Sequence, residues 1–285
     1  MSYFQLILIA LLQGVTEWLP ISSSAHVLLA SDFFGMSGEE ELLINAMAHL
    51  GTLGALLIYF WKDVARALNG GVELVTSPIT KKALSASGRL ALMIIAATPF
   101  ALIVAAGWEI IASDVMKDSL RNAYVVAGST IVFGALLWWA DVKGGVSRKE
   151  SDMTIKDAFL IGATQAIAAL IPGTSRSGIT MTASRALGFE REEAARFSML
   201  IGAPILAAVG AYAFLELSQA DGTGAATLSD GLFVAGVSFV SGWLSIAALM
   251  FLLKRMSFLP FVLYRFVLGG ALLFLAPGLT AATLH

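Results

Sequence analysis

The sequence predicts an all-α polytopic membrane protein, and three observations lead to this fold class. Of the 285 residues, 58% are hydrophobic and only 13% are charged, against about 25% charged residues in a soluble domain. Several apolar runs reach the roughly 20 residues that a helix needs to span a bilayer. Finally, Gln13 and Pro20 recur as Gln165 and Pro172, with an offset of 152 residues in both cases. We therefore expect a single integral membrane domain over residues 1–285, built from two related halves.

Six spanning helices are expected from the longer apolar runs. Two shorter apolar runs, 3–19 and 157–171, each end at a proline, and a second short segment follows each of them, at 23–35 and 177–188. We interpret each pair as a re-entrant helix–loop–helix hairpin that enters and leaves the membrane on one side. Such broken backbone is tolerated at membrane depth only inside protein or beside a water-filled cavity. The spans are expected at about 43–61, 88–107, 121–140, 196–216, 231–253 and 261–281, and the hairpins at about 3–35 and 157–188.

Loop charges predict the orientation. Basic residues gather in the loops after the first, third and fifth spans and before the fourth, whereas the opposite side holds only Lys117 and Arg121. Because basic loops stay cytoplasmic, both termini should lie outside. Three spans separate the two hairpins, so the halves, at about 1–140 and 153–281, should have opposite topology. This is an inverted-repeat plan, whose site lies near the midplane where the hairpin tips meet. The basic loop residues are Lys62, Arg66, Lys81, Lys82, Arg89, Lys143, Arg148, Lys149, Lys156, Arg185, Arg191, Arg196, Lys254 and Arg255.

Composition also argues against several classes of function. The chain has no cysteine, which excludes disulfides and thiolate chemistry. No basic run exceeds two residues, as in Lys81-Lys82, so nucleic-acid binding is not indicated. The N-terminus lacks a positive segment before its apolar run, so a cleaved signal peptide is not expected.

The first hairpin carries a carboxylate at membrane depth. Gln13 and Glu17 are four residues apart, so they share one face of a helix that Pro20 then breaks. A carboxylate in a membrane segment is costly and is a functional candidate by default. The alternative role for Glu17 is a structural ion pair with an arginine.

A row of hydroxyls and a histidine follow that proline. Ser22, Ser23 and Ser24 stand where a new helix should begin, and His26 falls in its first turn. Hydroxyls at such a position cap free N–H groups, and the same N–H groups attract anions. The alternative is that the serines only cap the helix while His26 bonds to the backbone.

The second hairpin carries the features of an anion site. Its two glycines allow the backbone to approach a ligand closely. Arg176 supplies a fixed charge with a planar fork that suits phosphate oxygens. The segment is not a P-loop, because the Gly-Lys-Ser/Thr element is missing. The alternative is that Arg176 forms a permanent ion pair that holds the hairpins together. The remaining candidates in this hairpin are Gly173, Thr174, Ser175, Ser177, Gly178 and Thr180.

Several other residues have a structural interpretation. His49 lies within the first expected span, where a helix–helix hydrogen bond is the expected role. Small residues at helix interfaces allow close packing. This interpretation is applied to Gly51, Gly54, Gly202 and Gly210.

These motifs resemble those of a known family, the bacterial undecaprenyl-diphosphatases, also called bacitracin-resistance proteins. Gln13-Gly-Val-Thr-Glu17 resembles the family's (Glu/Gln)-x-x-x-Glu motif, and the stretch from Glu17 to His26 is similar to the segment that follows it. Residues 172–180 match the family's Pro-Gly-x-Ser-Arg-Ser-x-x-Thr motif at every fixed position. Length, span number and inverted repeat also fit over the whole chain. Where many members have Glu, this chain has Gln13, which leaves one carboxylate fewer for a metal.

The resemblance implies an integral membrane hydrolase that converts undecaprenyl diphosphate to the monophosphate and inorganic phosphate. This reaction recycles the lipid carrier for peptidoglycan and other envelope polymers, and raised levels would give bacitracin resistance. It further implies a divalent cation, Mg²⁺ or Ca²⁺, a site that opens to the periplasm from the bacterial inner membrane, and often a homodimer. No nucleic-acid partner is implied.

Carried over onto this sequence, the motifs suggest roles for individual residues. Arg176 would hold the diphosphate, Glu17 would bind the metal or orient a nucleophile, and Gln13 would be a neutral metal ligand. Either Ser23 attacks phosphorus with His26 as base, or His26 is itself the nucleophile, or water attacks directly. The expected substrate-binding residues are Ser22, Ser24, Gly173, Thr174, Ser175, Ser177 and Thr180.

Transport is the competing class of function. Inverted repeats with paired broken helices are a transporter plan, so the same fold could move a lipid phosphate or an anion. A transporter needs no base and no nucleophile, and Glu17, Ser23 and His26 beside the anion site therefore favour an enzyme. A purely structural scaffold leaves the membrane-embedded Glu17 and Arg176 without explanation.

Overall fold

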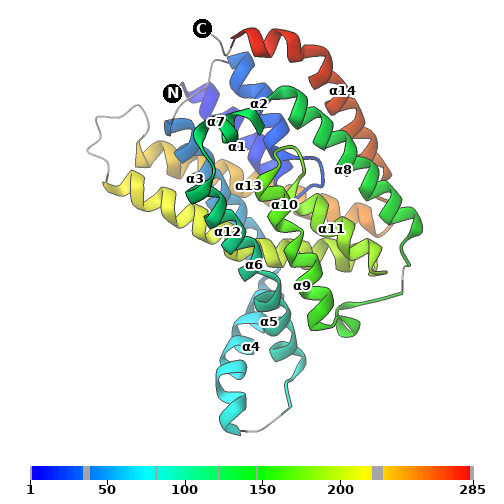
Figure 1. The fold of residues 1–285 in the computed structure, drawn as a ribbon. Helices are drawn as coiled ribbons and strands as arrows, with labels where there is room; N and C mark the ends of the chain where they lie inside the picture. Colours follow the sequence, from blue (N-terminus) through cyan, green and yellow to red (C-terminus); the bar gives the residue numbers. More distant parts are fainter. Residues whose placement is uncertain are drawn as a thin grey trace.

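The fold is an assembly of helices, seen in a computed structural model that describes residues 2–34, 39–80, 83–120, 122–145, 147–219 and 227–282. In this part of the chain there is no β-strand beyond an isolated bridge between Arg148 and Phe189. Figure 1 shows the arrangement. The helices are α1 (Tyr3–Thr16), α2 (Ser23–Phe34), α3 (Glu39–Tyr59), α4 (Trp61–Thr80), α5 (Ala86–Ala97), α6 (Pro99–Ile111), α7 (Asp114–Leu120), α8 (Ala123–Lys143), η1 (Glu150–Asp152), α9 (Ile155–Ala163), α10 (Gln165–Leu170), α11 (Arg176–Ala186), α12 (Arg191–Gln219), α13 (Leu228–Leu253) and α14 (Leu259–Ala282).

The prediction of an all-α polytopic membrane protein is confirmed. In the described residues, five helical segments are long and apolar enough to cross a bilayer. They are the joined pair α5 and α6, then α8, α12, α13 and the Leu259–Pro277 part of α14. A sixth span is present if α3 and α4 are counted as one, although their axes differ by 89°. The described residues therefore hold five or six candidate spans, against the six that were expected.

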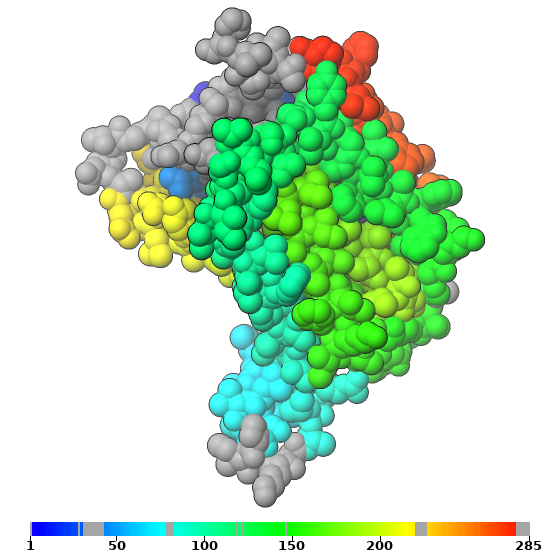
Figure 2. All heavy atoms as spheres, viewed as in Figure 1, coloured from blue at the N-terminus to red at the C-terminus, as the bar shows by residue number. Residues whose placement is uncertain are grey.

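The segment after the first expected span is a helix and not the loop that we predicted. It forms α4, which packs against α5. A Cβ on Gly70 would overlap the carbonyl oxygen of Ser87, so the missing side chain is what lets α5 come so close. Glu73 fixes the connection by accepting hydrogen bonds from both the backbone and the hydroxyl of Ser85. In Figure 2 this pair of helices stands out as a narrow extension below the body.

Both hairpins have the expected helix–loop–helix form. The first consists of α1, a loop and α2, and the second of α9, α10, a loop and α11, with a break at Thr164. Ser22 and Ser175, immediately before α2 and α11, have φ values of 73° and 68°, and they are the only non-glycine residues with positive φ in the described ranges. Such strain persists only where the surroundings enforce it. Re-entrance into a membrane and the boundaries of the two halves stay predictions.

Residues predicted to share the cytoplasmic side do lie near one another. Arg66 and Arg196 both pair with Glu150, at 2.5 and 2.7 Å. Near the end of α8, Asp141 Oδ1 forms ion pairs with Nε of Arg185, at 2.9 Å, and with Nε of Arg191, at 2.8 Å. The grouping of these charges thus agrees with the predicted topology, while the side of the membrane on which they lie stays a prediction. Lys81, Lys82 and Arg121 lie outside the described residues.

Candidate active site

The structure brings the two hairpin tips into contact. Ser24 on α2 accepts a hydrogen bond from the backbone N–H of Gly173, at 3.0 Å. From the other side, the hydroxyl of Ser177 donates to the carbonyl oxygens of Glu17 and Leu19, at 3.2 and 3.0 Å. Each hairpin therefore supplies side chains that bond to the backbone of the other, which holds the two loops in one register.

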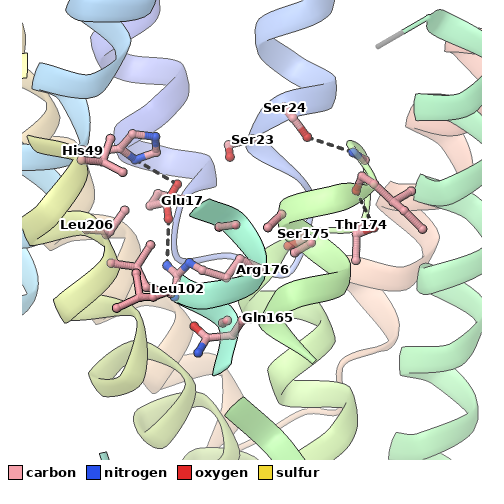
Figure 3. A pocket seen from close by; sticks show the side chains of 18 residues that line it. Glu17, Ser23, Ser24, His49, Leu102, Gln165, Thr174, Ser175, Arg176 and Leu206 are labelled. Carbon is pink, nitrogen blue, oxygen red and sulfur yellow. Dashed lines mark hydrogen bonds and ion pairs between the residues drawn. The ribbon is translucent and has the colours of Figure 1, made fainter. Parts of the chain in front are cut away.

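An ion pair between Glu17 and Arg176, marked by a dashed line in Figure 3, joins the hairpins. Arg176 Nη2 donates to Glu17 Oε1 at 2.8 Å, and both side chains are largely buried. The guanidinium also lies over the ring of Trp18, 5.3 Å from its centroid. Its second nitrogen, Nη1, is buried without a hydrogen-bond partner among the described residues and faces Gly202 of α12. Arg176 thus has one nitrogen engaged with Glu17 and one that packs against α12 without a hydrogen-bond partner among the described residues.

His49 of α3 completes this group. Its Nε2 accepts a hydrogen bond from the side-chain amide of Gln13 at 3.0 Å, so the expected helix–helix hydrogen bond is confirmed. Its Nδ1 lies 3.4 Å from Glu17 Oε2. Sequence reasoning assigned His49 a structural role only, and it missed this second contact because nothing in the sequence places α3 beside the first loop.

The second loop is shaped so that only small or strained residues fit. Gly173 has φ of 86°, and a Cβ there would lie 3.0 Å from Thr130 Oγ1 and closer still to Ser129 Oγ on α8. Ser175 caps α11 by accepting a hydrogen bond from Gly178 N at 3.1 Å. The first N–H groups of a helix have no acceptor within it, and such groups can bind an anion.

These elements surround a cavity of about 260 Å³. Residues from the two hairpins form its polar part, and α6 and α12 supply apolar walls, including Leu102 and Leu206, which are labelled in Figure 3. A polar floor beside apolar walls suits an amphiphile with a charged head. Of the predicted site residues, the lining includes Glu17, Ser23, Ser24, Gly173, Thr174, Ser175 and Arg176.

Other predicted site residues do not line this cavity. Ser22 and Thr180 are fully buried, and Ser177 is almost so. Thr180 donates to backbone carbonyls of its own helix, at 3.0 Å for Arg176 O. The hydroxyls of Ser177 and Thr180 bond to backbone carbonyls, and that of Ser22 bonds to the hydroxyl of Ser24 at 3.1 Å, so all three are engaged within the protein.

His26 is also placed elsewhere. Its Nδ1 lies 2.7 Å from Ser22 O, and its Nε2 lies 2.6 Å from the hydroxyl of Tyr264, against which the ring stacks. His26 and Tyr264 line a separate, mostly apolar groove between α1 and α14, of about 520 Å³. Ser23 and His26 both lie in the first turn of α2, but Ser23 faces the cavity and His26 faces the groove.

Gln165 is a further residue on the cavity. Its Nε2 donates to Ala97 O at 3.3 Å, and its Oε1 is buried without a partner in the described part of the chain. From the sequence, Gln165 was recognised only as the repeat partner of Gln13. The 152-residue offset was the signal that could have placed it at the site, because equivalent positions in two inverted halves approach the same midplane.

Comparison with known proteins identifies the family. The sequence profile described as "Bacitracin resistance protein BacA" matches residues 6–271. The chain belongs to this family. Curated relatives named "Undecaprenyl-diphosphatase" include those of Hyphomonas neptunium, at 65% identity over 97% of this chain and 98% of the relative, and Maricaulis maris, at 47% over 96% and 98%. A third, from a Jannaschia species, is 42% identical over 97% of this chain and 99% of the relative.

In this member of the bacitracin-resistance family, the side chains at the site offer a divalent cation few ligands. Gln13 Oε1 is buried and has no hydrogen-bond partner among the described residues, and it lies on the same helical face as Glu17. Over the same residues, no group of three or more His, Asp or Glu side chains is arranged to hold a metal. One carboxylate and one amide oxygen do not form a cage of protein ligands. They fit Mg²⁺, which keeps several waters and takes the rest of its ligands from substrate phosphates.

Proposed function

We propose that this chain is an integral membrane hydrolase that converts undecaprenyl diphosphate to undecaprenyl phosphate and inorganic phosphate. The observation that carries the proposal is the cavity of about 260 Å³, in which Ser23, Ser175 and Arg176 lie beside apolar residues of α6 and α12. The names of relatives up to 65% identical support the same reaction. The transport alternative receives no support from these names.

Arg176 and the start of α11 bind the diphosphate in this proposal. Phosphoryl transfer requires mainly positioning and neutralisation of charge. The guanidinium contributes a fixed positive charge, and the N–H groups of the second loop contribute aligned donors. Glu17 keeps Arg176 in place through the 2.8 Å contact. A substrate phosphate in the cavity would bind the Arg176 guanidinium beside this contact.

Ser23 is the nucleophile that the geometry favours over His26. Ser23 lines the cavity, whereas the two ring nitrogens of His26 are engaged outside it. Ser23 Oγ would attack the terminal phosphorus while the bond to the bridging oxygen breaks. The hydroxyl proton would pass to the departing undecaprenyl phosphate, and a phosphoserine would remain. Water would then cleave the phosphoserine to free phosphate. Direct attack by water is the remaining alternative, and a trapped phosphate on Ser23 distinguishes the two.

Gln13 and Glu17 would hold a divalent cation when substrate is present. The cation would neutralise charge on the diphosphate oxygens. The chain's own contribution is one carboxylate oxygen and the free Gln13 Oε1.

Location and assembly complete the proposal. We place the protein in the bacterial inner membrane with both termini outside and the cavity open to the periplasm, following the loop charges. In that setting, hydrolysis recycles the lipid carrier for envelope polymers and confers bacitracin resistance. A homodimer is expected from the family resemblance alone.

The test is phosphate release from a polyprenyl diphosphate in detergent, with Mg²⁺, by native protein and by Arg176→Ala. Loss of release in Arg176→Ala is expected. The matched control is Arg255→Ala, because Arg255 stacks on Phe251 at the end of α13 and does not line the cavity. No release by native protein that is folded by circular dichroism would refute the phosphatase and make lipid-phosphate flux across liposomes the next measurement.

A further inference from the structure

Arg265 is a buried cation that the sequence interpretation did not use. It lies within α14, and its side chain is fully buried, with 0% exposure. A charged residue inside a membrane segment is costly and marks a functional site by default. The contacts of this guanidinium therefore require an explanation.

All five N–H groups of Arg265 are used, and every acceptor is a backbone carbonyl oxygen. Nε donates to Thr130 O of α8 at 2.9 Å. Nη1 donates to Thr174 O at 3.1 Å and to Pro20 O at 3.4 Å. Nη2 donates to Gly173 O at 3.0 Å and to Thr174 O at 3.1 Å. One side chain thus holds α8, the loop of the first hairpin and the loop of the second.

Neighbouring residues make room for this arrangement. A Cβ on Gly134 of α8 would lie 3.2 Å from Arg265 Cβ, and a Cβ on Gly178 would lie 3.0 Å from Arg265 Nη1. Both distances are shorter than an ordinary contact. Two glycines on different helices therefore leave the space that the guanidinium fills.

The charge of Arg265 has no counter-ion among the described residues. The other fully buried arginine, Arg185, pairs with Asp141 at 2.9 Å. Arg265 makes no such ion pair within the ranges that the structure covers, and its acceptors are neutral. Its positive charge consequently lies directly behind the loop whose other side faces the cavity.

We propose that Arg265 is a positioning residue of the candidate active site. It holds the two loop tips in register, so that Ser23 and Arg176 face one cavity, and it adds a positive charge behind the anion-binding loop. The catalytic part of this inference rests on the proposed function. The loop-holding part does not, because it follows from the five contacts alone.

Steady-state kinetics of folded variants test the catalytic part. Arg265→Gln loses both the planar guanidinium and its charge. We expect kcat to fall about 100-fold, because a misplacement of about 1 Å at a reacting group costs about that much in rate. We also expect KM for the polyprenyl diphosphate to rise. Arg265→Lys keeps the charge, but its ammonium cannot reach four carbonyl oxygens at once. We expect it to lower kcat about tenfold with KM close to the native value.

Arg185→Lys is the matched control. Arg185 is equally buried and also donates to backbone carbonyls, but its acceptor Gly145 does not line the cavity, whereas Gly173 and Thr174, which accept from Arg265, do. We expect a lower melting temperature with kcat per folded molecule and KM unchanged. A purely structural role for Arg265 would give this same pattern in Arg265→Gln.

A thiol probe tests the loop-holding part without catalysis. The chain has no cysteine, so Ile21→Cys introduces a single thiol in the first loop, at a position that is only 6% exposed. We expect maleimide to label this thiol at least about tenfold faster when Arg265→Gln is also present, because the loop has lost its donor to Pro20 O. If Arg265→Gln does not fold, Gly134→Ala is the milder variant, and it should lower kcat and speed labelling by severalfold.

The outcomes are separable. Unchanged kcat, KM and labelling in folded Arg265→Gln, or in Gly134→Ala should Arg265→Gln fail to fold, overturn the inference. If native protein releases no phosphate while labelling still accelerates in Arg265→Gln, the proposed function fails and the loop-holding role stands.

Discussion

Replacing Gly202 by alanine should inactivate the protein by displacing Arg176. Gly202 lies on α12, and its bare Cα faces the guanidinium. A Cβ there would stand 2.5 Å from Arg176 Cζ and closer still to Nη1. Since the guanidinium is the far end of a flexible side chain, it should move while the helix stays.

The required movement can be estimated from these distances. A carbon–carbon contact needs about 3.5 Å, so Cζ must retreat by at least about 1 Å. The 2.8 Å contact between Arg176 and Glu17 then lengthens beyond hydrogen-bonding distance. A displacement of about 1 Å at a reacting group costs about 100-fold in rate. We therefore expect kcat/KM for a polyprenyl diphosphate to fall about 100-fold in Gly202→Ala.

The assay is phosphate release per folded molecule, with Gly236→Ala as the matched control. Gly236 is also a glycine within a spanning helix, but a Cβ there meets nothing within 4 Å. In both variants, alanine favours the helix by about 1 kcal/mol, so the helix-propensity gain is the same. Activity of folded Gly202→Ala within about threefold of Gly236→Ala would refute the reasoning, because it would mean that Arg176 need not occupy its observed position.

Two further predictions concern pH and metal. Burial would raise the pKa of Asp157, but hydrogen bonds from Arg148 and Thr154 outweigh it and hold the pKa below its ordinary value of 3.8. The carboxylate therefore stabilises the fold above that pH and loses this effect as the pH falls. In thermal scans at pH 7, Asp157→Asn should lower the melting temperature by several degrees. The difference between the native and variant melting temperatures should shrink below about pH 3.8. A constant difference across that range would contradict this assignment. Chelation by EDTA should abolish phosphate release. Gln13→Leu should raise the Mg²⁺ concentration for half-maximal activity about tenfold, because it removes the unpartnered Oε1. If the Mg²⁺ titration of Gln13→Leu superimposes on the native curve, Gln13 is not a metal ligand.

Sequence reasoning reached the parts of the site that depend on local pattern. The prolines and the 152-residue offset located both broken segments, and the cost of burying charge singled out Glu17 and Arg176. The structure places these two residues 2.8 Å apart. Both interpretations of that pair, a structural ion pair and a binding site, are compatible with the structure, because Arg176 is paired with Glu17 and also lines the cavity.

The residues that were missed depend on which helices become neighbours. His49 and Gly202 were assigned to helix packing, and only the three-dimensional arrangement shows that they face Glu17 and Arg176. Arg265 could have been found, since an arginine inside an apolar run is itself a signal. The helix α4 was missed because its charged residues suggested a loop, although Leu68, Val72 and Val75 recur at helical spacing.

The contacts of Arg265 also constrain how the protein can be assembled during synthesis. Its acceptors, on Pro20, Thr130, Gly173 and Thr174, all belong to segments that leave the ribosome before α14. A helix that carries a lone arginine enters a bilayer at a cost of about 2.5–3.5 kcal/mol, and the carbonyls that offset this cost are gathered only after both hairpins have formed. We therefore expect α14 to be stably inserted only after the two hairpins have met.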